Sequence, residues 1–177
     1  MQLRMKEAPD RAVLSAAARY RRLCDGYGAL FIINDRPDLA VRCGADGVHL
    51  GQDDVPIEQA RNAVGEDRLI GLSTHTAAQL DGAREVDYIG VGPVYSTPTK
   101  PGREAVGVEL VEYAARRAQV PFFAIGGINT GNVAAVCAVG ANRVAVVRAL
   151  TDSNDPEATG RALRSAVLRR EVAVGSP

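Results

Sequence analysis

The sequence predicts an α/β protein of the (β/α)8, TIM-type barrel class, and three observations carry that prediction. Short apolar runs alternate with helical patterns along the chain, as is typical of parallel strands buried on both faces. Residues 44–48 are similar to residues 140–144, and each segment lies between a helical pattern and a strand pattern, which indicates a reused βα unit. Polar residues and glycines follow the strands, at the edge where barrels carry their active sites.

Seven strands are expected, and their limits follow from the apolar runs. They are residues 2–5, 29–33, 47–50, 69–72, 88–91, 121–125 and 143–147. The first run begins with the chain itself, so an eight-stranded barrel would lack its first strand and helix. We therefore expect a TIM-type barrel that is N-terminally truncated to about seven strands and forms a single domain over residues 1–177. A dinucleotide-binding sheet is disfavoured because Tyr95 replaces the third glycine of its fingerprint in 90–95.

Helices between the strands are predicted from capping signals. Asp10 is the expected N-cap of the first helix and Gly26 its end. The starts of three later helices are marked by Pro37, Pro56 and the Asp155-Pro156 pair, since proline suits a first helical position.

The composition excludes several function classes. Lys and Arg together number 21, as do Asp and Glu, so the formal net charge is zero and neither nucleic acid nor an anionic membrane is an expected partner. The chain has no 18-residue apolar run and no signal-peptide pattern at its start, and its three cysteines form no CxxC pair. These features predict a cytoplasmic protein in a reducing compartment, and they leave a homo-oligomer open.

Two carboxylates follow neighbouring strands. Asp35 ends one strand and Asp54 follows the next, so both are expected at the same rim. Mg²⁺ takes one or two carboxylates together with phosphate oxygens and water, so the pair is a candidate Mg²⁺ site. The alternative is that each carboxylate caps a helix, because Asp35 precedes Pro37 and Asp54 precedes Pro56.

Two further segments suit phosphate groups. The loop 96–102 combines hydroxyls with Lys100 between prolines. The Gly126-Gly127 pair ends a strand and is expected to open a helix, so that backbone N–H groups can approach an anion. Arg148 is expected to end the last strand and to add a positive charge beside them.

Gln2, Arg4 and Lys6 alternate along the first strand, so they are expected on one face, where two cations would require an anionic partner. A solvated terminus is the competing interpretation. His75 follows Ser73-Thr74 and is a candidate acid or base, although a lone histidine is more often structural.

Taken in order, these motifs resemble the thiamine-phosphate synthase family over essentially the whole chain. The matching segments are residues 2–6, 34–35, 47–52, 73–75, 92–95, 97–100 and 126–128. The resemblance implies a transferase that joins hydroxymethylpyrimidine diphosphate to a thiazole phosphate and releases pyrophosphate.

The resemblance also implies roles for individual residues. The pyrimidine diphosphate would be held by Gln2, Arg4, Lys6, Asn34, Ser73 and Lys100, of which Arg4, Lys6, Ser73 and Lys100 would act in catalysis. Mg²⁺ would be held by Asp35 and Asp54. The thiazole phosphate would be held by Thr97, Thr99, Gly127, Val147 and Arg148. Arg148 departs from the family, which often has a small hydroxyl residue there.

Two alternatives stay open. A thiazole tautomerase would share the fold and the phosphate anchor and would use a histidine at position 75, but it has no need of Asp35, Asp54 and Lys100. A non-enzymatic, degenerate phosphate-binding barrel is favoured by the missing first βα unit, and it would bind phosphate without turnover.

Overall fold

The computed structural model describes residues 1–98, 102 and 104–174, with side chains described as far as residue 169. The chain divides into two compact units. Unit 1 comprises Met1–Ser73 and Arg84–Tyr88, and unit 2 comprises Thr74–Ala83 and Ile89–Pro177. In the part of the chain that the structure describes, no helix combines the length and the apolar character that crossing a membrane requires.

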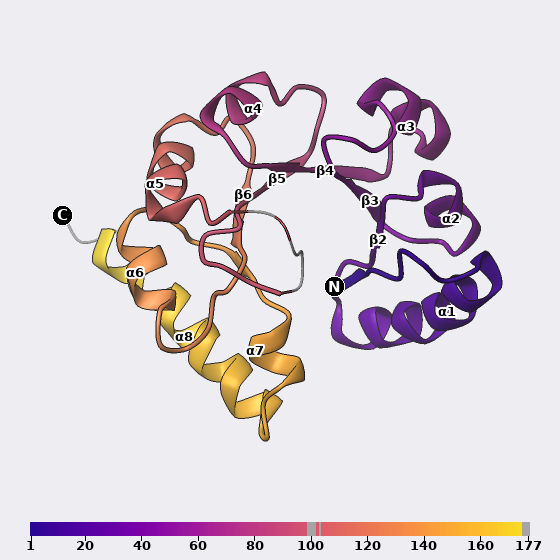
Figure 1. Cartoon of the computed structure of the whole chain (residues 1–177). Coiled ribbons are helices and arrows are strands. Elements are labelled where there is room, and N and C mark those ends of the chain that lie inside the picture. The colour runs from indigo at the N-terminus through magenta and orange to yellow at the C-terminus, as the bar shows by residue number, and fades with distance from the viewer. Residues whose placement is uncertain (99–101, 103, 175–177) are drawn as a thin grey trace. The chain divides into compact units, whose positions relative to one another are not determined.

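Unit 1 contains parallel strands with helices on one side of them (Figure 1). Its strands are β1 (Gln2–Leu3), β2 (Ile32–Asn34), β3 (Gly47–Leu50) and β4 (Leu69–Thr74), the last residue of which belongs to unit 2. Its helices are α1 (Asp10–Tyr27), α2 (Pro37–Arg42) and α3 (Ile57–Val64). The core between the two layers is made of fully buried side chains, including Phe31, Leu39, Val48 and Ile70.

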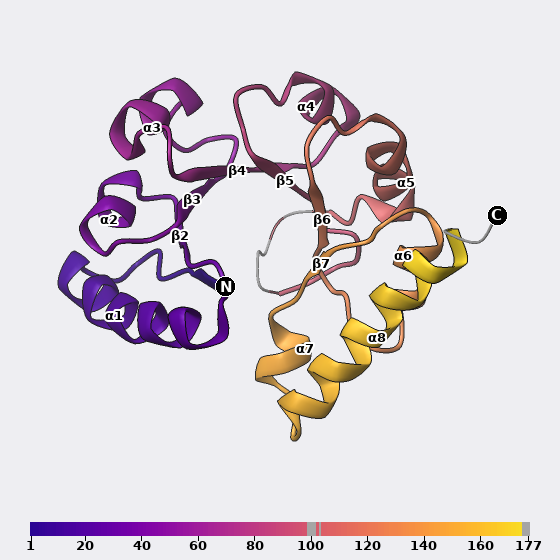
Figure 2. The same cartoon turned by 180° about the vertical axis from the view of Figure 1, so that it is seen from behind.

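Unit 2 repeats this βα arrangement (Figure 2). Its strands are β5 (Tyr88–Val91), which starts in unit 1, β6 (Phe122–Ile125) and β7 (Val144–Ala145), and they pair in parallel. Its helices are α4 (Ala77–Gly82), α5 (Gly107–Arg117), α6 (Val133–Ala138), α7 (Arg148–Thr151) and α8 (Pro156–Val174). Helix α8 packs against α6 and α7. Val91, Val111 and Val136 are among the fully buried side chains of this core.

All seven predicted strands are present, and the residue ranges of β3 and β5 are as expected. Other limits were wrong by a few residues. β7 ends at Ala145 rather than at residue 147, because the chain turns into α7, whose first residue is Arg148. Helix α1 ends at Tyr27 and is capped by Gly28 rather than by Gly26, since Gly28 takes the left-handed conformation with φ of 60°. Asp10 is the first residue of α1 rather than its N-cap.

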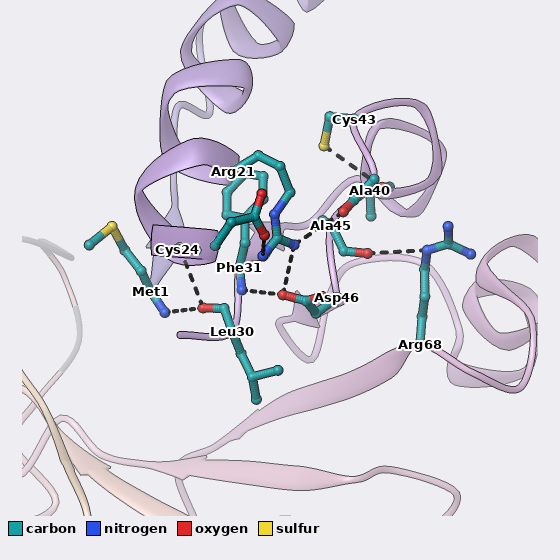
Figure 3. Close-up of polar contacts among 12 residues, drawn as sticks. Met1, Arg21, Cys24, Leu30, Phe31, Ala40, Cys43, Ala45, Asp46 and Arg68 are labelled. Carbon is teal, nitrogen blue, oxygen red and sulfur yellow. Dashed lines mark hydrogen bonds and ion pairs between the residues drawn. The ribbon is translucent and has the colours of Figure 1, made fainter. Parts of the chain in front are cut away.

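Asp46 connects three segments of unit 1 (Figure 3). Its Oδ2 accepts the N–H of Phe31 at 2.6 Å and pairs with Nη1 of Arg21 on α1 at 2.8 Å. The Arg21 guanidinium lies 5.7 Å from the centre of the Phe31 ring. Burial alone would raise the pKa of Asp46, but these two donors outweigh it and hold the pKa below its ordinary value.

A similar arrangement recurs two βα units later. Asp87 Oδ2 accepts the N–H of Ile70 at 2.7 Å and pairs with Nη2 of Arg61 on α3 at 2.9 Å. In both cases an aspartate just before a strand accepts a backbone N–H at the start of the preceding strand and pairs with an arginine of a helix. In the similar segments 44–48 and 140–144, Asn142 occupies the position that corresponds to Asp46. Its side chain, however, accepts a hydrogen bond from Arg143.

We expect Asp46→Asn to lower the free energy of unfolding by about 2 kcal/mol at neutral pH, because a charge-assisted hydrogen bond and an ion pair are lost. The depressed pKa means that the stabilisation exists above the ordinary pKa of 3.8 and is lost as pH falls through the folded-state value. Urea denaturation at pH 7 and pH 3 measures both effects. Asp25→Asn is the control, because Asp25 contacts the same arginine from an exposed position, and an equal loss in both variants would contradict the prediction.

Candidate functional site

Polar side chains gather where the strands of unit 1 end. Asn34 and Asp35 lie at the end of β2, and Asp54 follows β3. Ser73 lies near the end of β4 and is buried. The strand register pairs Asn34 with His49 and His49 with Gly71, so these ends lie at one edge of the sheet. The predicted common rim is therefore present in unit 1.

Asp35 is the most unusual carboxylate of this rim. Burial raises its pKa above the ordinary value, Lys6 opposes the rise, and the hydrogen bond and negative charge of Asp54 add to it. Lys6 Nζ lies 2.7 Å from Asp35 Oδ2. Two carboxylates close together, one of which resists ionisation, are a donor set that a divalent cation would stabilise. Among the described residues no group of three or more His, Cys, Asp or Glu forms a metal cluster, so these two carboxylates would need oxygens from a bound phosphate or from water.

The alternative that these aspartates cap helices was wrong. Arg36 is the N-cap of α2, and Pro56 is the N-cap of α3. Asp35 has a left-handed backbone with φ of 64°, and its N–H donates to the carbonyl of His49 at 2.8 Å. Asp54 Oδ2 instead accepts the N–H of Gly51 at 2.6 Å, which fixes the carboxylate within its own turn. Non-glycine residues adopt positive φ at a cost, and this often marks a functional site.

The prediction for the first strand was only partly correct. Gln2 and Leu3 alternate as expected, exposed and buried, but β1 ends at Leu3. Arg4 follows the strand, and Lys6 lies in a turn beyond it, so the three polar residues do not share one strand face. Lys6 reaches the rim through its ion pair with Asp35, while Arg4 is exposed. Only Gln2 and Leu3 of this segment pair with β2, opposite Ile32 and Ile33.

Ser73 is held by a chain of polar contacts that the sequence did not reveal. His49 Nε2 lies 2.9 Å from Ser73 Oγ, and His49 Nδ1 lies 3.1 Å from the hydroxyl of Tyr88. Gln52 Nε2 donates to the carbonyl of Ser73 at 2.6 Å. A signal existed, since His49 is the one polar residue in the apolar run of β3. The sequence alone could not say which side chain His49 contacts.

In unit 2, Gly126 and Gly127 follow β6 with φ of 100° and 64°. A Cβ at Gly127 would lie 2.7 Å from Cβ of Tyr95, and a Cβ at Gly126 would lie 2.5 Å from Pro93. The glycines therefore allow the loop after β5 to pack directly on this turn. The Tyr95 N–H also donates to the Gly126 carbonyl at 3.0 Å.

The expectation that the glycine pair opens a helix was wrong. Helix α6 begins only at Val133, after a turn in which Asn132 Oδ1 accepts the N–H of Asn129 at 2.8 Å. Asn129 Oδ1 accepts the N–H of Gly131 at 2.8 Å, and Asn132 Nδ2 donates to the Gly127 carbonyl at 2.9 Å. Asparagine side chains thus bind the backbone of this turn. Because α6 begins six residues after Gly127, the glycines do not lie at the N-terminus of that helix.

The remaining thiazole-site predictions fall on several parts of the chain. The pairing of Ile125 with Ala145 places Gly127 and Val147 each two residues beyond a paired position on adjacent strands. Arg148 is exposed and binds Asp152 Oδ2 through Nε at 2.7 Å. Thr97 lies in the loop after β5, whereas Thr99 and Lys100 lie outside the described residues. Nothing in the described geometry assigns a ligand to these positions.

His75, the candidate acid or base, lies just after β4 and is held through both its ring and its backbone N–H. Its Nδ1 hydrogen-bonds to the Gly92 carbonyl, and its N–H donates to Gln79 Oε1 at 2.8 Å. These contacts favour the structural interpretation of this histidine.

Comparison with known sequences gives a consistent result. Residues 1–150 match a family model described as thiamine monophosphate synthase. The chain is 50% identical over 165 residues to a thiamine-phosphate synthase of Thermosynechococcus vestitus, an alignment that covers 92% of this chain and 47% of that protein. It is 55% identical over 164 residues to a thiamine-phosphate synthase of Gloeobacter violaceus, covering 90% and 47% of the two chains. The chain thus spans about half the length of the curated relatives it matches.

Solved structures agree with the sequence comparison. The thiamine phosphate pyrophosphorylase of Pyrococcus furiosus superposes with a TM-score of 0.87 at 33% identity, covering 96% of this chain and 82% of that one. A 3-hexulose-6-phosphate synthase superposes with a TM-score of 0.65 at 19% identity, covering 87% and 80%, and this likeness concerns the fold alone. The α/β fold of parallel strands followed by helices is therefore shared with both proteins.

Proposed function

The chain belongs to the thiamine monophosphate synthase family, and from this premise we propose that it catalyses thiamine-phosphate formation. The substrates would be hydroxymethylpyrimidine diphosphate and a thiazole phosphate. The observation that carries the proposal is the Asp35–Asp54 carboxylate pair with Lys6 beside it, at the strand ends of unit 1. This combination of two acids and a cation suits a metal-bound diphosphate.

The reaction requires no oxidant or reductant. The bond between the pyrimidine methylene carbon and the diphosphate oxygen breaks, and both electrons leave with pyrophosphate. The thiazole nitrogen then gives its lone pair to the methylene carbon, forming the carbon–nitrogen bond and a thiazolium cation. Since negative charge grows on the leaving group, stabilisation of pyrophosphate is the principal task of the site.

The residues that match the family motifs would divide this task among them. Arg4 and Lys6 follow β1 and would bind the diphosphate as cations, together with Lys100. Asp35 and Asp54 would hold Mg²⁺, which when bound supplies positive charge to the diphosphate oxygens. Ser73, Asn34 and Gln2 would donate hydrogen bonds to the pyrimidine substrate. These roles rest on the family resemblance, supported by the common rim in unit 1.

The thiazole phosphate would be held in unit 2, at the Gly126-Gly127 turn that follows β6. Thr97, Thr99, Val147 and Arg148 would complete this anchor. Its contribution would be positioning, since a fixed phosphate holds the thiazole nitrogen in line with the methylene carbon. From the family resemblance we infer that residues 1–177 form one catalytic domain of the TIM-type barrel class. A cytoplasmic location and a homo-oligomer stay predictions.

The test is an assay of thiamine-phosphate formation by this chain with both substrates and Mg²⁺, with EDTA as the control. Mg²⁺-dependent product is expected. A folded protein that binds pyrophosphate but forms no product would contradict the proposal and support the degenerate phosphate-binding barrel. Conversion between thiazole tautomers without pyrimidine substrate would support the tautomerase instead.

Arg148 gives a second test of the thiazole site. We expect Arg148→Ser to raise the KM for the thiazole phosphate about tenfold, because a charged hydrogen bond to phosphate is lost. Asp152→Asn should act in the opposite direction, since Asp152 binds the guanidinium and competes with the phosphate for it. Steady-state kinetics of both variants, with the pyrimidine substrate saturating, measure the two changes in the KM for the thiazole phosphate. Unchanged KM values in both would show that the arginine does not contact the substrate.

A further inference from the structure

His49, Tyr88 and Ser73 form a connected chain of hydrogen-bonding groups within unit 1. The two ring nitrogens of His49 each have a hydroxyl within hydrogen-bond distance, at 3.1 Å for Tyr88 and 2.9 Å for Ser73. Ser73 is buried, with 7% of its surface exposed, so its hydroxyl direction is set by the protein more than by water. The proton on the His49 ring therefore decides whether Ser73 donates or accepts within the chain.

The Tyr88 ring is fixed in place by its surroundings. A Cβ at Gly71 would lie 2.1 Å from Cζ of Tyr88, so the ring packs directly on the backbone of β4. The ring also lies against His49, with centroids 5.5 Å apart. Burial raises the pKa of the Tyr88 phenol, so its hydroxyl keeps its proton and can donate it. A protonated hydroxyl in a fixed ring is a suitable donor to Nδ1.

We propose that His49 is a positioning residue that acts through Ser73, and this rests on the proposed function. Tyr88 donates to Nδ1, so the ring proton lies on Nε2, and Nε2–H donates to Ser73 Oγ. The serine oxygen then accepts from His49, and its own proton is directed to an oxygen of the bound diphosphate. With the opposite tautomer, Nε2 would accept the serine proton, and Ser73 would present no donor to the anion.

The backbone of Ser73 is held from a second direction. Gln52, in the loop that also carries Asp54, donates to the Ser73 carbonyl at 2.6 Å. The hydroxyl and the main chain of Ser73 are thus both bound by side chains from β3 and the loop after it. Donors that are already oriented need not reorganise when charge develops on the leaving group. The hydrogen-bonded chain of Tyr88, His49 and Ser73 would give the Ser73 hydroxyl this advantage.

The first measurement is the tautomer of His49, which needs no turnover. Nitrogen-15 chemical shifts of the two histidines in the parent should show a proton on Nε2 of His49, assigned by the loss of its signals in His49→Gln. Tyr88→Phe removes only the hydroxyl and should shift His49 toward a mixture of tautomers. A proton on Nδ1 in the parent would overturn the proposal.

The second measurement is binding of inorganic pyrophosphate with Mg²⁺ by calorimetry. His49→Asn, whose amide is too short to reach Ser73, should weaken binding about tenfold, and Ser73→Ala should do the same. His49→Gln places an amide N–H near the former Nε2 and should recover most of the affinity. The double variant His49→Asn/Ser73→Ala should bind no more weakly than Ser73→Ala, because the histidine acts through the serine. Additive losses would overturn the proposal.

These outcomes separate this inference from the proposed function. If the parent forms no thiamine phosphate but shows the Nε2 tautomer and the non-additive losses, only the proposed function fails. If the parent is active but the losses add or Tyr88→Phe leaves the tautomer unchanged, only the role of His49 fails. In the active enzyme His49→Asn should lower kcat more than it raises the KM for the pyrimidine substrate, since the donor acts on charge that develops in the transition state.

Discussion

Asp35→Asn should reduce Mg²⁺-dependent thiamine-phosphate formation on the order of a hundredfold or more, without destabilising the metal-free protein. The substitution keeps the shape of the side chain, and asparagine tolerates the left-handed backbone found at this position. It removes the negative charge that burial and Asp54 disfavour, at the expense of a partly exposed ion pair with Lys6. Turnover and thermal melting, each with and without Mg²⁺, measure the two effects.

Asp38→Asn is the matched control for this variant. Asp38 lies three residues further along, and its ion pair with Arg36, at 2.8 Å, holds its pKa below the ordinary value. We expect this control to lose a little stability and no activity. If Asp35→Asn retained the parent's response to Mg²⁺, the proposal that Asp35 binds the metal would be wrong.

The raised pKa of Asp35 also predicts a pH dependence. The folded protein binds this proton more tightly than the unfolded chain, so Asp35 destabilises the metal-free protein as pH rises from the ordinary value of 3.8 through the raised one. Mg²⁺ requires the ionised carboxylate, so its stabilising effect should increase over the same interval. Melting temperatures across this interval should show both trends in the parent and neither in Asp35→Asn.

Gly127→Ala should raise the KM for the thiazole phosphate about tenfold or more and leave the KM for the pyrimidine diphosphate nearly unchanged. Alanine at φ of 64° costs about 1–2 kcal/mol, and its Cβ would lie 2.7 Å from Cβ of Tyr95. The turn after β6 must therefore move away from the loop after β5. Steady-state kinetics with each substrate varied in turn measure the effect.

Gly131→Ala tests whether any added methyl group in this loop has the same effect. Its Cβ would meet only the Asn129 Oδ1 atom, at 3.2 Å, and its backbone has no positive φ in the range that disfavours alanine. We expect the KM for the thiazole phosphate to remain near the parent value in this control. A normal KM in Gly127→Ala would show that the glycine turn is not part of the anchor.

The sequence by itself determined the alternation of strands and helices, because short apolar runs and capping residues are local signals. It also predicted that Asp35 and Asp54 lie at one rim, since parallel strands bring their carboxyl ends to the same edge. It did not determine where the elements end: Arg148 was expected to end the last strand but begins α7. The point at which a chain leaves a sheet depends on which residues of the neighbouring strand can still pair with it.

Only the tertiary structure decided which polar groups meet. The raised pKa of Asp35 results from burial and from the carboxylate of Asp54, which lies in the loop after β3. The contacts of His49 with Tyr88 and Ser73 join residues 39 and 24 positions apart. Residue spacing can indicate which side of a strand a side chain faces. Which nitrogen of an imidazole carries the proton is determined by the hydroxyls that packing places beside the ring.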